Sequence, residues 1–395
     1  MFTRLSIFLL AALLSGRFAY AQEQAVVSVV KEAANKQTVS LGDVRVSGPQ
    51  GQAFLRTLQR NLQLSGYFTV AQSGSVRISG SVRETAPGQA TIACTVDAPA
   101  KRFRYSQSGD SERAARGLVD TLVEQLTGKK GMASSQIAVI LHRSPDNADL
   151  YTMYADGYGL RQLTRTARAA VGPRWSPDRS SLYFTSYKRD FPAAYRVGAD
   201  GSGLRPLIRF NGLSTGATLA PNGALVALIL SYNGNPELCT LDPFAARLKR
   251  LTKTKYAAEA SPCWSPDGRQ IVYVSDASKS PQLYICELAS GKIRRLTYRG
   301  SESVNPCWGA NGLICFATRR GAGYQVATID PRIGEASVKL VGEGESPSWA
   351  ADGRHIVCSR KEGRKSAVWL LDTQGDAPVR LTRHQGNWIC PSASR

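Results

Sequence analysis

The feature that most constrains this chain is a short turn sequence that recurs at a nearly constant interval. Trp264-Ser265-Pro266-Asp267-Gly268 is the clearest copy, and related segments begin at Trp175, Leu219, Trp308 and Trp349. These starting positions lie 44, 45, 44 and 41 residues apart. Proline sets φ at the first turn position, aspartate caps the backbone and glycine accepts a positive φ. Each copy therefore predicts a tight reversal of the chain.

A second motif ends each repeating unit. It is a basic residue followed, directly or after one residue, by leucine and often by threonine, and it occurs at 161–164, 205–207, 250–252, 295–297, 339–340 and 380–382. Two short apolar runs separate the two motifs, as at 271–274 and 283–286, and they are rich in the β-branched and aromatic residues that favour strands. Four antiparallel strands every 40 to 45 residues or so are typical of a β-propeller. The six copies of the end motif predict six blades.

The two ends of the repeat region complement each other. The first unit starts at 136–141 and lacks an inner strand, whereas the end of the chain, at 387–392, supplies a matching strand with no turn after it. Pairing these two segments would close the ring and remove exposed sheet edges. We therefore expect residues 131–395 to form a six-bladed propeller closed by the C-terminal strand.

Residues 22–130 carry no repeat and predict a separate domain. Apolar residues recur at helical spacing over 50–64 and 111–126, and residues alternate as in strands over 76–82 and 90–96. The predicted fold is therefore mainly β, a six-bladed β-propeller preceded by a small α/β domain.

The first 21 residues predict an export signal. Arg4 is followed by an apolar run over 5–14 and by Ala19-Tyr20-Ala21, a small-x-small cleavage site. The run is too short to cross a bilayer of about 30 Å as a helix, and no later segment has the length to do so. We expect an exported mature chain from Gln22, peripheral to the membrane. The full chain has a formal charge of +20, and the mature chain keeps +18 after loss of Arg4 and Arg17. This charge favours acidic proteins or the anionic cell envelope as partners, and not nucleic acid, which an exported protein rarely meets.

The order of signal peptide, small α/β domain and propeller with Trp-Ser-Pro-Asp-Gly turns resembles the TolB family over nearly the whole chain. Residues 61–68 also resemble the helix end of that family's first domain. The resemblance implies a periplasmic, monomeric scaffold that binds the lipoprotein Pal through the propeller and TolA through the N-terminal segment. It further implies a role in outer-membrane integrity and in constriction at cell division. Residues 22–30 depart from the family's TolA-binding segment.

Enzymatic chemistry finds little support in the sequence. His142, His355 and His384 show no metal-ligand spacing, and no phosphate loop or dinucleotide fingerprint is present. Residues 212–216 match the hydrolase nucleophile pattern, but no helix is predicted after them. We expect no catalysis, metal or cofactor. The alternative is a propeller enzyme of the cell envelope, such as a lyase or the propeller of a peptidase, because the same turn repeat occurs in peptidase-associated propellers.

The expected partner site is the propeller face formed by the segments between each outer strand and the next inner strand. Such segments surround one mouth of the central channel, opposite the Ser-Pro-Asp-Gly turns, and polar groups beside an apolar side chain suit a protein interface. The candidate residues are Glu259, Ser261, Glu302, Ser303, Asn305, Glu345, His384, Asn387 and Trp388.

Overall fold

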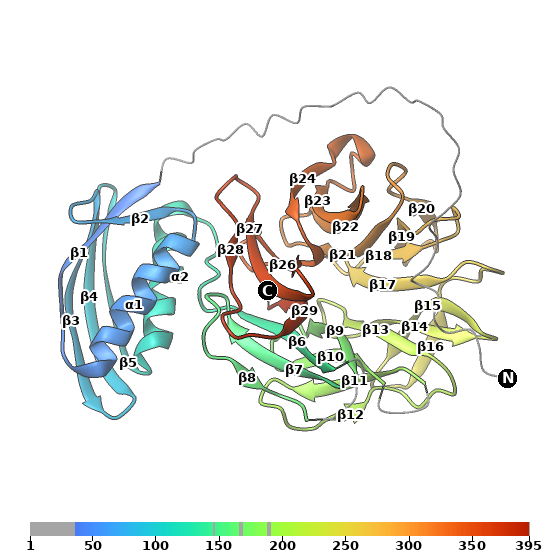
Figure 1. The fold of residues 1–395 in the computed structure, drawn as a ribbon, viewed down its shortest axis with the longest axis horizontal. Helices are drawn as coiled ribbons and strands as arrows, with labels where there is room; N and C mark the ends of the chain where they lie inside the picture. Colours follow the sequence, from blue (N-terminus) through green and yellow to red (C-terminus); the bar gives the residue numbers. More distant parts are fainter. Residues whose placement is uncertain (1–35, 145–146, 166–168, 188–190, 395) are drawn as a thin grey trace. The chain divides into compact units, whose positions relative to one another are not determined.

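The computed structural model describes residues 36–144, 147–165, 169–187 and 191–394. They form a five-stranded sheet with two helices, followed by six four-stranded sheets (Figure 1). The expectation of a six-bladed propeller preceded by an α/β domain is confirmed. The signal peptide expected at 1–21 lies outside the described residues.

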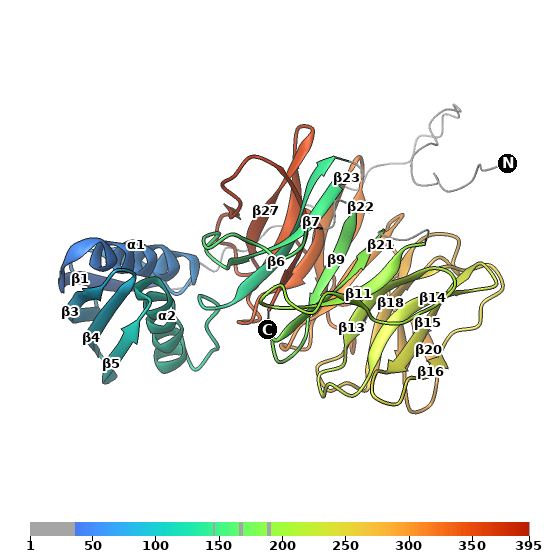
Figure 2. The ribbon, with the colours of Figure 1, turned by 90° about the horizontal axis from the view of Figure 1, so that it is seen from below.

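The first domain is an α/β sandwich of one sheet and two helices. Its elements are β1 (Gln37–Val46), α1 (Gly48–Leu64), β2 (Phe68–Ala71), β3 (Val76–Ala86), β4 (Gln89–Ala98), β5 (Lys101–Gly109) and α2 (Ser111–Thr127). The sheet order is β2-β1-β3-β4-β5, and β1 runs parallel to both β2 and β3. Figures 1 and 2 show both helices on one face of this sheet.

The helices form where their apolar residues can cover that face. Phe54, Leu58 and Leu62 of α1 are fully buried in the domain core, which is the helical spacing read from the sequence. Asp110 caps α2 by accepting the Arg113 N–H at 2.8 Å, and Gly128 ends the helix with φ 67°.

Three strands of this domain, β1, β2 and β5, have no counterpart in the sequence expectation. β5 is an edge strand whose residues alternate between exposed and half-buried, and it carries charges such as Lys101 and Arg104. Edge strands tolerate charge because one face and one edge meet solvent. β1 pairs with β2 and β3, β2 with β1, and β5 with β4, so the place of these three strands depends on their neighbours in the sheet.

Each blade of the propeller is a four-stranded antiparallel sheet, and we number the blades 1 to 6 in chain order. Blade 1 holds β6 (Gln136–Ser144), β7 (Asn147–Tyr154), β8 (Arg161–Gln162) and, as its inner strand, β29 (Asn387–Ala393). Blade 2 holds β9 (Ala170–Trp175), β10 (Ser181–Ser186), β11 (Ala193–Gly198) and β12 (Arg205–Pro206), and blade 3 holds β13 (Ser214–Leu219), β14 (Val226–Tyr232), β15 (Asn235–Asp242) and β16 (Arg247–Arg250).

The remaining blades repeat the same order from inner to outer strand. Blade 4 holds β17 (Glu259–Trp264), β18 (Gln270–Ser275), β19 (Gln282–Glu287) and β20 (Ile293–Arg295). Blade 5 holds β21 (Ser303–Trp308), β22 (Ile314–Arg320), β23 (Gly323–Ile329) and β24 (Lys339–Glu343), with the 3₁₀ turn η1 (Glu335–Ser337) before β24. Blade 6 holds β25 (Glu345–Trp349), β26 (His355–Glu362), β27 (Lys365–Asp372) and β28 (Val379–Arg380).

Blade 1 joins the two ends of the propeller. β29 pairs antiparallel with β6, with Trp388 opposite Leu141 and Ala393 opposite Ile137. Trp388 is 2% exposed, and its ring meets Tyr151 edge to face at 5.5 Å between centroids. The last strand of the chain is therefore part of the core.

The repeated tryptophans connect neighbouring blades. Trp264 Nε1 donates to the Thr218 carbonyl of blade 3 at 2.9 Å, and Trp175 Nε1 donates to the Ser392 carbonyl of β29 at 3.0 Å. These two indoles are buried and keep their hydrogen bonds, so their rings contribute packing without an unpaired donor; Trp349 Nε1, by contrast, is buried with no hydrogen-bond partner among the described residues. The tryptophan at the end of an inner strand therefore packs one blade against the preceding one.

The leucine and threonine of the end motif have a structural role within a blade. Thr297 Oγ1 accepts the Leu283 N–H at 2.9 Å and donates to Gln282 Oε1 at 2.7 Å. Thr252 makes the equivalent contacts with Leu238 and Glu237 in blade 3. The hydroxyl satisfies a buried backbone donor at the start of the third strand, and Thr164 and Thr382 make the same contact in blades 1 and 6.

A buried carboxylate joins α1 and α2 to blade 1. The Asp156 side chain is fully buried and accepts hydrogen bonds from Asn61 Nδ2 at 2.9 Å and Arg116 Nε at 3.1 Å. Arg116 is 1% exposed, and its guanidinium lies 3.9 Å from the centroid of the Tyr154 ring. Glu112, which is 43% exposed, also pairs with Arg116 at 3.3 Å, so removing Asp156 leaves the buried guanidinium with only this exposed carboxylate as a partner.

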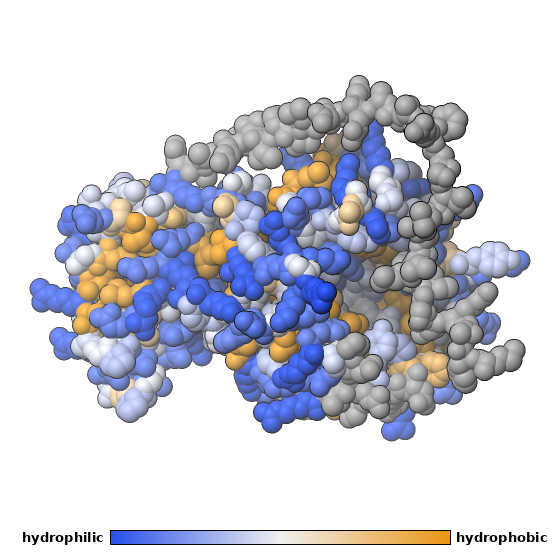
Figure 3. Space-filling model, viewed as in Figure 1, coloured by the Kyte–Doolittle hydropathy of each residue, from blue (hydrophilic) through white to orange (hydrophobic). Residues whose placement is uncertain are grey.

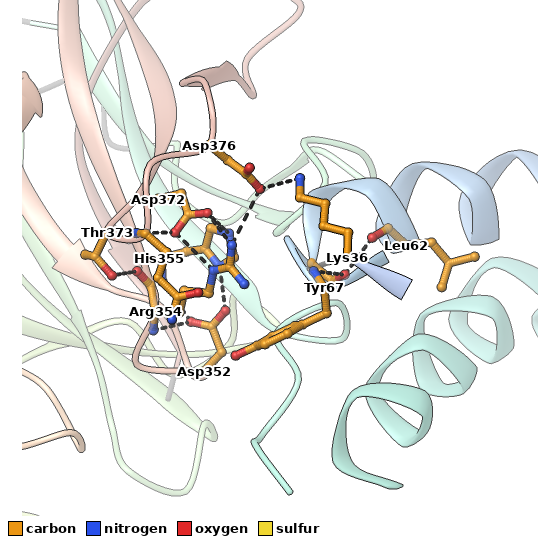
Figure 4. A network of polar contacts seen from close by, with 11 residues as sticks. Lys36, Leu62, Tyr67, Asp352, Arg354, His355, Asp372, Thr373 and Asp376 are labelled. Atoms are coloured by element: carbon orange, nitrogen blue, oxygen red, sulfur yellow. Dashed lines mark hydrogen bonds and ion pairs between the residues drawn. The ribbon is translucent and has the colours of Figure 1, made fainter. Parts of the chain in front are cut away.

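A second polar network, in blade 6, also contacts the first domain (Figure 4). Arg354 forms a bidentate pair with Asp372 at 2.6 and 3.0 Å, and its guanidinium lies 4.7 Å from the Tyr67 ring centroid. Burial acts to raise the pKa of Asp372, but the hydrogen bonds and charge of Arg354, together with His355 and the Gln374 N–H, outweigh it and lower that pKa. A Cβ at Gly66 would lie 2.4 Å from Arg354 Nη2, so this contact requires glycine.

Neither of the two helices in the described part of the chain is long and apolar enough to cross a membrane.

Replacing Trp388 by alanine should lower the free energy of unfolding by about 3 to 5 kcal/mol, because it leaves a large cavity in the joint between β29 and β6. Phe244→Ala is the control, because Phe244 is 87% exposed, and its effect should stay within about 0.5 kcal/mol. Urea denaturation followed by far-UV circular dichroism measures both. If the two variants lowered the free energy of unfolding equally, the packing of Trp388 would not stabilise the pairing of β29 with β6.

Asp156→Ala should cost about 3 to 5 kcal/mol, because Arg116 then stays buried without its carboxylate. Asp97→Ala removes one partner of an exposed pair with Arg102 and should cost less than about 1 kcal/mol. Urea denaturation compares the two. The double variant Asp156→Leu with Arg116→Met should recover much of the loss, and a double variant as unstable as the single one would argue against the buried pair.

Candidate partner-binding face

The inner strands define the two faces of the propeller. β9, β13, β17, β21, β25 and β29 all begin on one face, because each follows an outer strand, and the first five lead into a turn on the opposite face. We call the face on which they begin the inner-strand face, and the opposite face, which carries the Ser-Pro-Asp-Gly turns, the turn face. The candidate residues read from the sequence all lie on inner strands or just before them.

Every inner strand contains a residue with positive φ at the same position. These residues are Gly172, Gly216, Ser261, Asn305, Ser346 and Cys390, with φ between 50° and 65°. At each one the pairing register with the next strand shifts, as in a β-bulge. Non-glycine residues adopt this conformation at a cost, so the ring geometry imposes it on the last four.

These six residues surround one small cavity of about 70 Å³, which Arg174 and Pro262 also line. Ser261 Oγ donates to Asn305 Oδ1 at 3.3 Å, and Asn305 Nδ2 donates to Ser346 Oγ at 3.3 Å. The structure therefore brings two of the candidate residues, Ser261 and Asn305, into direct contact at the centre of the propeller.

Glu259 and Ser303 are the first residues of their inner strands and are buried, at 3% and 1% exposure. Glu259 Oε1 accepts the Ser275 hydroxyl at 3.1 Å, whereas Glu259 Oε2 and Ser303 Oγ have no hydrogen-bond partner among the residues that the structure describes. Burial raises the pKa of Glu259 to about 7. These two side chains lie beneath the surface of the inner-strand face.

Glu302 and Glu345 are less buried, and each pairs within its own blade. Glu302 accepts from Arg319 Nη1 at 3.4 Å and from the Tyr324 hydroxyl. Burial and this carboxylate raise the pKa of Tyr324 to about 12. Glu345 Oε1 lies 3.5 Å from Lys361 Nζ, with 38% of the Glu345 side chain exposed. Both carboxylates are accessible at the rim.

The three candidates before and within β29 divide between surface and core. His384 is exposed, and its carbonyl accepts Trp388 Nε1 at 3.1 Å. Asn387 Oδ1 accepts the Ser366 N–H at 2.9 Å. Trp388 is buried against Tyr151 of blade 1, so its ring packs beneath the rim and is not part of the exposed surface.

The sequence interpretation did not single out Ser346, Cys390, Gly172, Gly216 or Arg174, which complete the cavity. A signal for them exists, because five of the six positive-φ residues immediately precede a proline. Proline removes a backbone donor and is found at bulges. A repeated X-Pro step within an inner strand therefore marks the channel lining.

Apolar side chains are also exposed near this rim. Tyr256 and Tyr298, in the segments that lead to β17 and β21, are 82% and 60% exposed. Figure 3 shows a largely hydrophilic surface with smaller hydrophobic patches on the visible side of the molecule. Exposed aromatic side chains beside polar groups are the composition of protein interfaces.

The nucleophile-like segment has a structural explanation. Ser214 begins β13, is 1% exposed, and its Oγ accepts the Ala194 N–H at 3.0 Å. It lies in a strand and not at the strand-to-helix turn that this chemistry requires. Within the described ranges, no group of three or more His, Cys, Asp or Glu residues is placed to hold a metal ion.

Comparisons with known proteins agree with this architecture. The family model described as the TolB β-propeller domain matches residues 123–395. A protein TolB homolog from Chlorobium luteolum is 30% identical over 58% of this chain and 50% of its own length. The Tol-Pal system protein TolB from Bordetella pertussis is 25% identical over 72% of this chain and 70% of its own. The chain thus spans about half the length of the Chlorobium relative.

A solved structure shows the same fold. The crystal structure of TolB from Acinetobacter baumannii superposes with a TM-score of 0.79 at 22% identity, covering 91% of this chain and 97% of the other. At this identity the match supports the fold alone, and the family model supports the assignment. The chain belongs to the TolB β-propeller family.

Proposed function

We propose that this protein is a non-enzymatic scaffold of the Tol–Pal system, exported to the periplasm, that binds the lipoprotein Pal through the inner-strand face. The family match over residues 123–395 is the observation that carries this proposal. A role in outer-membrane integrity and cell division follows from the same assignment. A contact of the N-terminal segment with TolA belongs to the proposal too, and residues 22–30 lie outside the described part of the chain.

The geometry of the inner-strand face supports a binding role. Glu302, Glu345 and His384 lie at its rim with accessible side chains, and Ser261 and Asn305 line the central depression. Polar rim groups around a recessed centre suit a protein partner that inserts a few side chains. The polar side chains at the rim and centre form hydrogen bonds and ion pairs mainly with residues of their own blade or the next one. These contacts hold them in place, which suits a binding surface better than a catalytic site.

Glu259 adds a pH dependence to this face. Its Oε2 is buried with no hydrogen-bond partner in the described part of the chain, and Glu237 and Asp276 add negative charge nearby. Burial is the largest cause of the raised pKa, and these carboxylates reinforce it. Because the folded pKa lies above the unfolded one, the folded state holds the proton more tightly. Stability contributed by Glu259 is therefore full below its unfolded pKa and falls as pH rises through about 7.

The double variant Glu302→Arg with Glu345→Arg should weaken capture of purified Pal at least 10-fold, because it reverses two accessible rim charges. Arg269→Glu is the control, an exposed charge reversal on the turn face. Surface plasmon resonance with immobilised Pal measures both, and circular dichroism confirms folding. Loss of capture in the control, with full capture by the double variant, would assign Pal to the opposite face.

Glu259→Gln should stabilise the protein at pH 8 by about 1 to 3 kcal/mol, because the amide avoids burying a charge. The gain should shrink towards zero at pH 5, where the carboxyl of the parent protein is already neutral. Urea denaturation at the two pH values measures the difference. A gain independent of pH would show that Glu259 does not titrate in this range.

A further inference from the structure

The centre of the propeller holds one cation in an otherwise neutral cavity. Of the residues that line the 70 Å³ cavity, Arg174 is the charged one. It lies on the inner strand β9, two residues after Gly172. Arg174 also lines an adjoining pocket of about 220 Å³ that opens between Trp175, Trp264 and the prolines of the turns. Its side chain therefore belongs to the channel and not to the outer surface.

Arg174 has weak contacts within the protein. Its Nη1 donates to the neighbouring Pro173 carbonyl at 3.4 Å, which is a long hydrogen bond. Among the residues that the structure describes, no carboxylate forms an ion pair with it. Glu345, at the start of β25, pairs instead with Lys361, whose Nζ lies 3.5 Å from Glu345 Oε1. A guanidinium between low-dielectric walls, without a counter-ion, attracts an anion more strongly than an exposed one does.

The rest of the cavity supplies neutral hydrogen-bonding groups and space. Ser261, Asn305, Ser346 and Cys390 form a continuous polar wall, with the Ser346 Oγ and Cys390 Sγ atoms 3.8 Å apart. Gly172 and Gly216 contribute no side chain, and a Cβ at Gly172 would meet no atom within 4 Å. The cavity is therefore open beside Gly172, is closed by the Pro262 ring beside Gly216, where a Cβ would lie 2.9 Å from Pro262 Cδ, and is polar on the other side.

We propose that this cavity is a carboxylate-binding site, in which Arg174 pairs with the anion and the Asn305 amide and the serine hydroxyls hold its oxygens. Guanidinium matches carboxylate as a planar, bidentate partner. A cavity of 70 Å³ admits a group of a few atoms and excludes a folded segment. The carboxylate can come from an acidic side chain of a protein seated on the inner-strand face, or from a small free acid.

The test is an acetate titration of the full-length mature protein, with sodium chloride at matched ionic strength as the salt control. The side-chain Nε–H resonance of Arg174, assigned by comparison with Arg174→Gln, should shift saturably with acetate and not with chloride. Arg174→Gln should lower the acetate affinity at least 10-fold, as measured by backbone resonances around Asn305. The exposed Arg269→Gln should leave it unchanged. A flat titration, or equal acetate binding by Arg174→Gln, would overturn the proposal.

A second variant keeps the proposal testable if Arg174→Gln fails to fold. Gly172→Asn keeps the cation but fills the open side of the cavity, and asparagine tolerates positive φ better than other side chains do. It should also abolish the acetate response while the Arg174 resonance remains visible. Acetate binding equal to that of the parent would contradict the site.

A competition experiment separates the two sources of the carboxylate. If saturating acetate lowers the affinity for Pal, beyond the effect of chloride, a side-chain carboxylate of the partner occupies the cavity. If Pal and acetate bind independently, the ligand is a small free acid. Both results require that the acetate titration has first shown binding, and that titration is done without Pal. Failure of Pal capture therefore refutes the proposed function and leaves the cavity test intact.

Discussion

The pairing of β29 with β6 is the constraint on which the propeller depends. Each blade has two apolar faces, and a ring of six satisfies all of them only if the first and last blades meet. The chain achieves this by placing its last strand inside its first blade, where Trp388 and Ala393 are buried. A closed sheet between the two chain ends replaces two open edges with a continuous set of backbone hydrogen bonds.

Closure also determines the geometry of the centre. Six inner strands converge on one axis, and each relieves the crowding with a bulge and a positive-φ residue at the same level. The bulges aim six equivalent positions at the channel. The side chains at those positions differ, with two glycines on one side and polar residues on the other, so the channel is asymmetric although the backbone is nearly six-fold.

Two kinds of polar interaction have different roles in this molecule. The threonines of the end motif satisfy backbone donors in blades 1, 3, 4 and 6, so the same local need recurs in four of the six copies. Asp156 and Arg354 occur once each and contact α1, α2 and the segment after α1. Buried ion pairs add little net stability but penalise misplacement strongly. They therefore specify how the first domain meets blades 1 and 6.

The sequence by itself determined the propeller, its blade number and the two helices of the first domain, because turn residues and apolar periodicity are local signals. It also indicated the segments of the inner-strand face. It did not reveal β1, β2 and β5, whose burial comes from neighbouring strands. Only the tertiary structure decided that Glu259 and Trp388 are buried while Glu302 and Glu345 are accessible. The cavity around Arg174 is also visible only in the tertiary structure, because residues some 44 positions apart meet there only after the ring closes.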